Sequence, residues 1–179
     1  MDDRVTLVVA IVGLALAVAS LVWQAATFVL AGARIKVRLQ QGAIGNGSAI
    51  VGPLDARIDF EDLRNQGFTQ PVLAIEVRNV GRMPISVTGW HAVLENRMSY
   101  TDARSPVNPE LSFRLEPQSK QTWYVELNPL HAAVSASHSA GIWPVDHQKV
   151  WMSVDLGNGK TVRTREFVRI GASDIAEGP

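Results

Sequence analysis

The chain has 179 residues, and its 17 lysine and arginine residues balance its 17 aspartate and glutamate residues, so no global charge points to a nucleic acid or an acidic partner. It contains no cysteine, which excludes disulfides, thiol nucleophiles and cysteine-ligated metals. Arginine outnumbers lysine 13 to 4, a bias that we interpret as the mark of a GC-rich bacterial or phage genome.

Residues 1–33 are predicted to form a transmembrane helix. No charged residue occurs from Val5 to Ala33, and about 20 apolar residues already cross the hydrocarbon core of a bilayer as a helix. A cleaved signal peptide is the alternative, since 31–33 would serve as a cleavage site, but residues 2 and 3 are acidic and the apolar run is too long. A buried helix of a soluble protein would show a polar face, which this segment lacks.

The first strand is expected directly after this helix. Residues 34–40 alternate strictly, with Ile35, Val37 and Leu39 on one face and three cations on the other, which is the period of a half-buried strand. Further strands are predicted at 48–51, 72–79, 85–94, 96–100, 111–115 and 119–127, followed by a hairpin whose strands flank a turn at 158–159. Gly89 interrupts the stretch 85–94 with a change of parity and predicts a β-bulge.

Two segments of the domain 34–171 are expected to lie mostly outside the strands, the first with 48–51 as a short edge strand within it. Residues 42–70 are interpreted as a long, glycine-rich loop that carries a helical turn or two, capped by Asp59 and closed by Gly67. Residues 129–140 are predicted to form a short helix, with Asn128 as its N-cap and Gly141 just past its end. The tail 172–179 is expected to be flexible.

Eight large apolar residues from the strands are predicted to form the core. They share the inward parity of their strands and include two tryptophans. They are Leu73, Ile75, Val77, Trp90, Trp123, Val125, Met152 and Val154. Seven or eight short strands after one apolar helix predict an all-β fold, an antiparallel β-sandwich.

Three stretches carry a resemblance to a known type of domain: LAIEVRNVGRMPISVTGW, FRLEPQSKQTWYVEL and VWMSVDLGNGKTVRTREFVRI. Their turn and core motifs are Asn79-x-Gly81 with Pro84, Leu115-x-Pro117, and Trp123. With these, residues 34–170 resemble bacterial immunoglobulin-like sandwiches of the CARDB and fibronectin-III-like kind, in particular uncharacterised actinobacterial proteins with an N-terminal anchor and one such domain. The resemblance implies adhesion, scaffolding or partner binding rather than catalysis.

The charges beside the helix predict the side of the membrane on which the domain lies. Only Arg4 precedes the helix, next to two aspartates, whereas Arg34, Lys36 and Arg38 follow it. Lysine and arginine collect on the cytoplasmic side. We therefore expect a single-pass protein of the cell membrane with a cytoplasmic domain, although sandwiches of the type named above often work outside the cell.

Few residues suggest chemistry. His131 and His138 lie seven apart on the predicted helix, about 10 Å along its axis and too far for one zinc ion, so they are interpreted as solvent-facing. Asp146 and His147 lack the turn that would present a serine nucleophile. The glycines at 42, 45 and 47 follow a strand without a βαβ unit and do not predict a nucleotide site. We therefore expect no enzyme activity, cofactor or metal.

A stripe along the predicted helix points to association in the membrane. Its members are small or polar and are spaced alternately four and three residues apart, as in the seam of paired helices. In lipid, helices associate through close approach at small residues and hydrogen bonds between polar ones. The stripe is predicted to pair with a second copy or, as an alternative, with a different helix; a chance arrangement in an alanine-rich segment is the third interpretation. It consists of Thr6, Ala10, Gly13, Ala17, Ser20, Gln24, Thr27 and Ala31.

Six cations are predicted on the outward faces of the first and last strands. If these strands lie side by side, the cations gather near the membrane. They would then either keep two strand faces solvated or bind anionic lipid headgroups or a partner; each basic residue near such a surface contributes about 1 kcal/mol. Nucleic acid is not expected, since aromatic stacking positions are scarce. The six are Arg34, Lys36, Arg38, Arg163, Arg165 and Arg169.

Taken together, the sequence predicts a membrane-anchored, non-enzymatic binding or scaffolding module, a subunit of a membrane assembly. The alternative is a membrane-active effector whose helices oligomerise into a pore, as in phage lysis or defence. The expected partners are the lipid bilayer and a further transmembrane helix, with a protein partner that the sequence does not identify.

Overall fold

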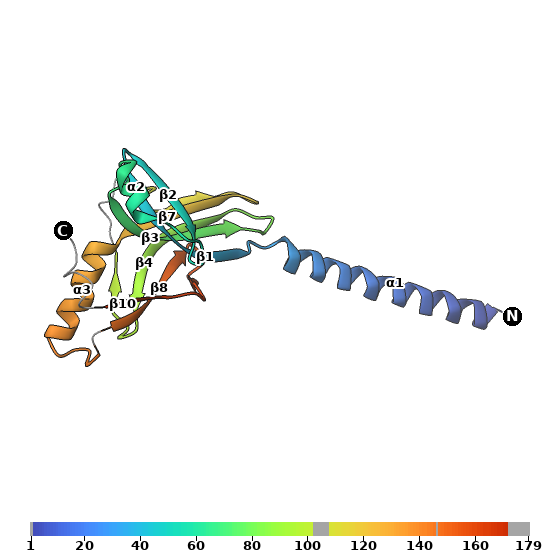
Figure 1. Ribbon diagram of the computed structural model, residues 1–179. Helices are drawn as coiled ribbons and strands as arrows, with labels where there is room; N and C mark the ends of the chain where they lie inside the picture. Colours follow the sequence, from blue (N-terminus) through green and yellow to red (C-terminus); the bar gives the residue numbers. More distant parts are fainter. Residues whose placement is uncertain (1, 102–107, 146, 172–179) are drawn as a thin grey trace.

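The computed structural model describes residues 2–101, 108–145 and 147–171. It consists of one long N-terminal helix, α1 (Asp2–Ala31), and a domain of mostly strands that begins at Ile35 (Figure 1). The helix projects away from this domain, and every described side chain of α1 is exposed. Its stretch Asp3–Thr27 is long and apolar enough to cross a membrane. The predicted tail 172–179 lies outside the described residues.

The domain contains two antiparallel sheets. The first has the order β2 (Ser48–Pro53), β1 (Ile35–Gly45), β3 (Gln70–Asn79), β7 (Lys120–Glu126). The second has the order β10 (Val168–Gly171), β8 (His147–Leu156), β4 (Ile85–Leu94), β5 (Ser99–Tyr100). Two short strands join the second sheet: β6 (Phe113–Leu115) pairs with β4, and β9 (Thr161–Arg163) pairs with β8. We call residues 35–171 the two-sheet domain.

One buried cluster holds the two sheets together. All eight residues predicted for the core are buried in it, at most 2% exposed, and they come from both sheets. Alternation explains this result, because successive side chains of a strand point to opposite faces and the inner faces of the two sheets pack against each other. The predicted bulge is confirmed by a shift of the β4–β8 register between Val87 and Gly89.

The interpretation of 42–70 as a long loop is wrong in large part. Strand β1 continues to Gly45, turns at 46–47 and pairs with β2, and Gly42 is buried where a Cβ would lie 1.9 Å from the carbonyl oxygen of Ile50. The glycines that suggested flexibility therefore permit close strand pairing. The helical turn is confirmed as α2 (Phe60–Asn65), capped by the carboxylate of Asp59, with Gly67 at a positive φ of 90°.

Helix α3 (Leu127–Ser139) follows β7 directly and covers one end of the two sheets, where it packs on β10, β3 and β7. Its N-cap is Glu126, so the prediction of Asn128 as N-cap is wrong by two residues. The predicted end is correct. Gly141 has φ 68°, its N–H donates to the carbonyl of His138, and that of Ile142 donates to Ser137. This is the hydrogen-bond pattern that stops a helix at glycine.

Candidate functional site

The stripe predicted on α1 lies on a helix that projects away from the two-sheet domain (Figure 1). Its residues from Thr6 to Thr27 are exposed, and a Cβ added at Gly13 would find nothing within 4 Å. The Thr27 hydroxyl donates to the carbonyl of Gln24 at 2.9 Å, so it is satisfied within the helix. The side chain of Ala31 lies outside the described side chains. The stripe is therefore available to another helix.

The linker between α1 and β1 is fixed by a turn 45 residues later in the sequence. Asn79, at the end of β3, is fully buried, and its side-chain oxygen accepts from the N–H groups of Gly81 at 3.0 Å and Arg34 at 3.4 Å. Its amide nitrogen donates to the carbonyls of Met83 at 2.8 Å and Leu115 at 3.3 Å. All four hydrogen-bonding positions of the Asn79 amide are thus filled.

Gly81 lies against the same linker. A Cβ at this position would be 2.4 Å from the carbonyl oxygen of Gly32, 2.4 Å from the nitrogen of Arg34 and 2.8 Å from the Cα of Ala33. The backbone N–H of Val80 also donates to the carbonyl of Arg34 at 2.8 Å. The turn 79–81 therefore holds the chain within three residues of the helix end, which limits how α1 can move relative to the domain.

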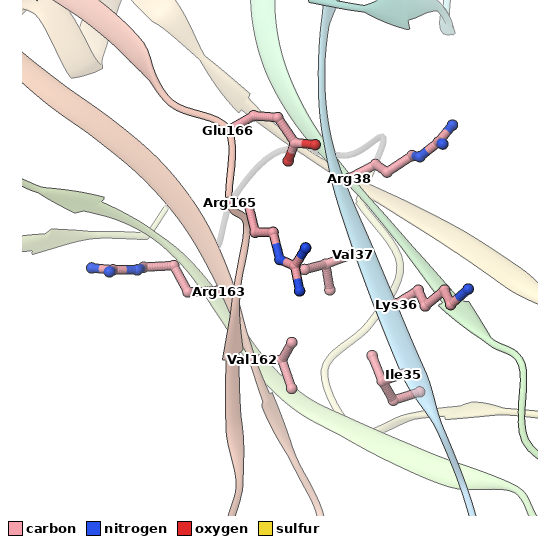
Figure 2. Close-up of a pocket in the computed structure, with 8 residues that line it drawn as sticks. All are labelled: Ile35, Lys36, Val37, Arg38, Val162, Arg163, Arg165 and Glu166. Atoms are coloured by element: carbon pink, nitrogen blue, oxygen red, sulfur yellow. The ribbon is translucent and has the colours of Figure 1, made fainter.

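A groove of about 530 Å³ runs along the first residues of β1. One wall is β1, and the other is β9 with the segment that follows it (Figure 2). Consecutive residues of β1 line it, so the groove follows the edge of the strand rather than one of its faces. The lining residues are Ile35, Lys36, Val37, Arg38, Val162, Arg163, Arg165 and Glu166.

The wall formed by β1 is an unpaired strand edge. Since Arg34 and Val80 form a hydrogen-bonded pair, the alternation of an antiparallel ladder directs the backbone groups of Lys36 and Arg38 toward β3 as well. Those of Ile35 and Val37 then point away from β3, into the groove. Strand β3 pairs with one edge of β1 along this part, and on the other edge β2 pairs only from Gln40 onward, so among the described strands none pairs with that edge at residues 35–39.

The opposite wall is also an unpaired edge. Within the second sheet, β9 pairs with β8 through Val162 and Val154, and the N–H of Thr164 donates to the carbonyl of Met152 at 2.9 Å. By the same alternation, the backbone groups of Arg163 point away from β8. No described strand pairs with that side of β9. The groove thus separates two strand edges that belong to different sheets.

The six predicted cations do not gather into one patch, so that expectation is corrected. The strands that carry them do lie side by side, but Lys36 and Arg38 point outward on one side of the groove, and Arg163 points away on the other (Figure 2). Arg165 alone extends into the gap, toward Val37. Arg169 lies opposite Lys149 in the pairing of β10 with β8. This is the end of the second sheet away from α1, six residues along β8 from Asp155, which lies opposite Thr161 of β9.

Cations missed by the sequence analysis extend the basic face of β1. The register places Lys36 beside Arg78 of β3, and Arg78 beside Lys120 of β7, so three cations form a row across the first sheet. The carboxylate of Glu76 accepts from Lys120 at 2.9 Å and offsets one of them. Alternation already indicated that these residues point outward, but only the strand order places them side by side.

The outer face of the second sheet holds an aromatic and cationic cluster. The guanidinium of Arg163 lies 4.9 Å from the ring centre of Trp151, and the ammonium of Lys149 lies 5.6 Å from that of Phe167. Lys149 also donates to the carboxylate of Glu95, from its backbone at 3.2 Å and from its side chain at 3.1 Å. These hydrogen bonds lower the pKa of Glu95. Stacking on Trp151 explains why Arg163 turns away from the groove.

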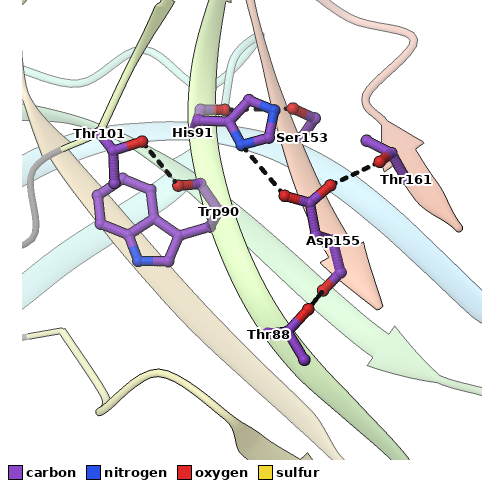
Figure 3. A network of polar contacts seen from close by, with 7 residues as sticks. All are labelled: Thr88, Trp90, His91, Thr101, Ser153, Asp155 and Thr161. Carbon is purple, nitrogen blue, oxygen red and sulfur yellow. Dashed lines mark hydrogen bonds and ion pairs between the residues drawn. The ribbon is translucent and has the colours of Figure 1, made fainter. Parts of the chain in front are cut away.

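A polar network on the same sheet joins a histidine to a carboxylate (Figure 3). Nδ1 of His91 lies 3.6 Å from Asp155, and the hydroxyl of Thr161 donates to the other carboxylate oxygen at 2.5 Å. Ser153 is buried, and its hydroxyl donates to the backbone carbonyl of His91 rather than contacting the imidazole. The network therefore lacks a nucleophile placed to give up a proton to His91.

The two helical histidines are half-buried, so the solvent-facing interpretation is wrong. Each lies within hydrogen-bond distance of a carbonyl: Nδ1 of His131 is 3.3 Å from Gly171, and that of His138 is 3.2 Å from Trp143. They hold α3 to the end of β10 and to the loop that follows α3. Within the described ranges, no three histidine or acidic side chains lie close enough to hold a metal ion. Asp146 lies outside those ranges.

Comparison with known proteins gives no further assignment: no family model, no curated protein and no solved structure matches this chain.

Proposed function

We propose that this chain is a single-pass membrane protein whose two-sheet domain is a non-enzymatic binding or scaffolding module in a membrane assembly. One observation carries the proposal: an exposed apolar helix is tied to the domain at Asn79, and a groove between two unpaired strand edges begins at the first residues after it. A groove held this close to a membrane is suited to a partner that is itself at the membrane.

We further propose that the domain is an immunoglobulin-like sandwich. Its pairing orders, β1-β3-β7 and β4-β8-β9, correspond to the orders A-B-E and C-F-G of that fold, with α3 in the E–F connection. Trp90 is buried on β4, the position of strand C, where immunoglobulin domains carry a buried tryptophan. This assignment supports a binding role, because the fold is widely used for recognition on loops and strand edges.

The domain is proposed to be cytoplasmic, from the excess of cations after the helix. Arg34, Lys36 and Arg38 are all exposed and lie within about 23 Å of the helix end at Ala31, at roughly 3.3 Å per extended residue. A C-terminal alkaline phosphatase fusion tests the orientation. An inactive fusion is expected, and an active one places the domain outside the cell.

A pore-forming effector is the second candidate, because the stripe residues from Thr6 to Thr27 are exposed on α1. Liposomes loaded with a self-quenching dye separate the two functions. A binding module leaves the dye inside after the full chain is reconstituted, whereas a pore releases it. Release that is abolished by Gly13→Leu would contradict the module and favour the pore.

Site-specific photo-crosslinking tests the module directly. A photoreactive residue at position 36 or 165 of the full chain, in native membranes, is expected to capture the same discrete protein. The matched control is position 61, an exposed residue of α2 on another part of the surface. Equal capture at position 61, or capture of lipid alone, would contradict a protein-binding role for the groove.

A further inference from the structure

We propose that the groove binds an extended, acidic segment of another protein as an added strand on the edge of β1; this inference rests on the proposed binding function and names the kind of partner. The first argument is the backbone. Ile35 and Val37 direct N–H and C=O groups into the groove, and such an unpaired edge is the template to which an extended peptide adds. The segment required is short, about five residues, because β2 occupies the edge from Gln40 onward.

The second argument is the side chains. In a sheet, residues of neighbouring strands that point to one face lie side by side. Residues of the added strand on the outer face would lie beside Lys36 and Arg38, both exposed, and those on the inner face beside Ile35 and Val37, both half-buried. Acidic residues fit the first face and apolar residues the second. An alternating acidic and apolar sequence therefore matches the edge of β1.

Charge around the groove supports the same partner. Lys36 and Arg38 on the outer side of β1 and Arg165 in the gap face it, against the single carboxylate of Glu166, while Arg163 turns away onto Trp151. Arg165 extends between the two walls, where it would meet a bound segment from the side of β9 (Figure 2). A neighbouring hollow of about 450 Å³ continues past Arg38 and adds Asp55. The excess of positive charge is thus greatest at the end of the groove near α1. The acidic residues of the partner are therefore expected close to the membrane that α1 crosses.

A second copy of this chain does not fit the edge. Antiparallel pairing of two β1 edges would direct the two α1 helices in opposite directions, which one membrane cannot accommodate. Parallel pairing in register would place Lys36 and Arg38 beside their own copies, and like charges directly opposite destabilise a strand pair. The partner is therefore a different, acidic segment.

The test uses the full chain in phosphatidylcholine nanodiscs and a labelled peptide of alternating valine and glutamate. We expect saturable binding by fluorescence anisotropy, with NMR amide shifts at Ile35–Leu39. Two control peptides isolate the two arguments. A valine and lysine peptide is expected not to bind, and the acidic peptide with every backbone nitrogen methylated is expected to bind at least about tenfold more weakly, because it cannot donate to the edge.

Protein variants test the location. Lys36→Glu together with Arg165→Glu is expected to weaken binding about tenfold, whereas Arg169→Glu, which changes a cation of β10 at the end of the second sheet away from α1, leaves it unchanged. A dispersed amide spectrum shows that each variant is folded, and the peptide controls need no variant at all. Equal binding of the methylated peptide would overturn strand addition, and equal loss in Arg169→Glu would overturn the groove as its place.

Phosphatidylserine nanodiscs decide between a peptide and a lipid surface. If anionic lipid abolishes peptide binding and the NMR shifts at Lys36 and Arg38 follow the lipid, this face is a headgroup surface and the peptide proposal is overturned. These outcomes overturn only the peptide proposal. The proposed function as a binding module is overturned by a different result, dye release from liposomes.

Discussion

The side-chain oxygen of Asn79 and the backbone N–H of Arg34, 45 residues apart, form a 3.4 Å hydrogen bond that connects the end of β3 to the linker after α1. The same side chain donates to the carbonyls of Met83 and Leu115, so one buried amide joins the start of β1 to the connection between β3 and β4 and to the end of β6. The orientation of the domain relative to the helix depends on this contact.

Asn79→Ala is expected to destabilise the domain. The substitution leaves buried donors and acceptors unpaired, at a cost of about 1–3 kcal/mol for each group left unsatisfied. Urea unfolding of the full chain in detergent micelles, followed by tryptophan fluorescence, measures the change. Asn65→Ala, at the exposed end of α2, is the control and is expected to change little. Equal stability of both variants would show that the Asn79 network is not needed.

Gly81→Ala is expected to displace the linker. The added Cβ would contact the backbone of residues 32–34 at 2.4–2.8 Å, and backbone cannot move aside as a flexible side chain can. Such overpacking costs roughly 1–3 kcal/mol. Spin labels on α1 and on β7 should report a broader distance distribution. Gly52→Ala is the matched control, since its Cβ would lie 3.5 Å from Ala56, an ordinary contact. An unchanged distribution in Gly81→Ala would contradict a fixed joint.

Trp123→Ala is expected to cost about 3–5 kcal/mol, the usual loss for a buried large aromatic side chain. Trp123 is 1% exposed and packs edge-on against Phe113 at 6.0 Å between ring centres. Thermal unfolding followed by circular dichroism gives the comparison. Trp151→Ala, on the half-exposed outer face of β8, should cost clearly less. A melting temperature equal to that of the native chain would show that Trp123 is not in the core.

Glu95 is expected to titrate below its ordinary pKa of 4.5, because the backbone and side chain of Lys149 donate to its carboxylate. A lowered pKa in the folded state means that the contribution of this contact is present above the unfolded pKa and is lost as the pH falls through the folded value. NMR titration of the carboxyl carbon measures the midpoint. Lys149→Met keeps the backbone hydrogen bond but removes the side-chain one and should raise the midpoint in part; an unchanged midpoint would contradict the side-chain contribution.

Helix α1 is expected to associate with itself through its stripe. Gln24 is the most important polar member, because Thr27 already donates within the helix and no hydrogen bond of the Gln24 amide is present in the described chain. An unpaired amide in hydrocarbon is costly, and a second Gln24 satisfies it. Crosslinking of the full chain in membranes should fall in Gly13→Leu and Gln24→Leu, while Leu14→Ala, off the stripe, is the control. Monomeric behaviour of the native helix would remove both self-association and the pore.

The sequence by itself determined the elements whose signals are local. The long apolar run predicts α1, alternation places Trp123 and Met152 in the core, and Gly89 marks the bulge, because each pattern depends only on the period of one helix or strand. Asp59 as the N-cap of α2 and Gly141 as the residue past the end of α3 were predicted in the same way, because the free backbone groups at a helix end bond to residues close in sequence.

Only the tertiary structure decided which distant segments meet. The pairing of β1 with β2 over Gly42, the bonds from Asn79 to Arg34, and the groove between β1 and β9 all depend on strand order and register, which no local period contains. Arg163 shows the same limit: alternation directs it outward, but its position on Trp151, away from the other cations, follows from the contact between β8 and β9. The placement of the candidate site is therefore a property of the fold as a whole.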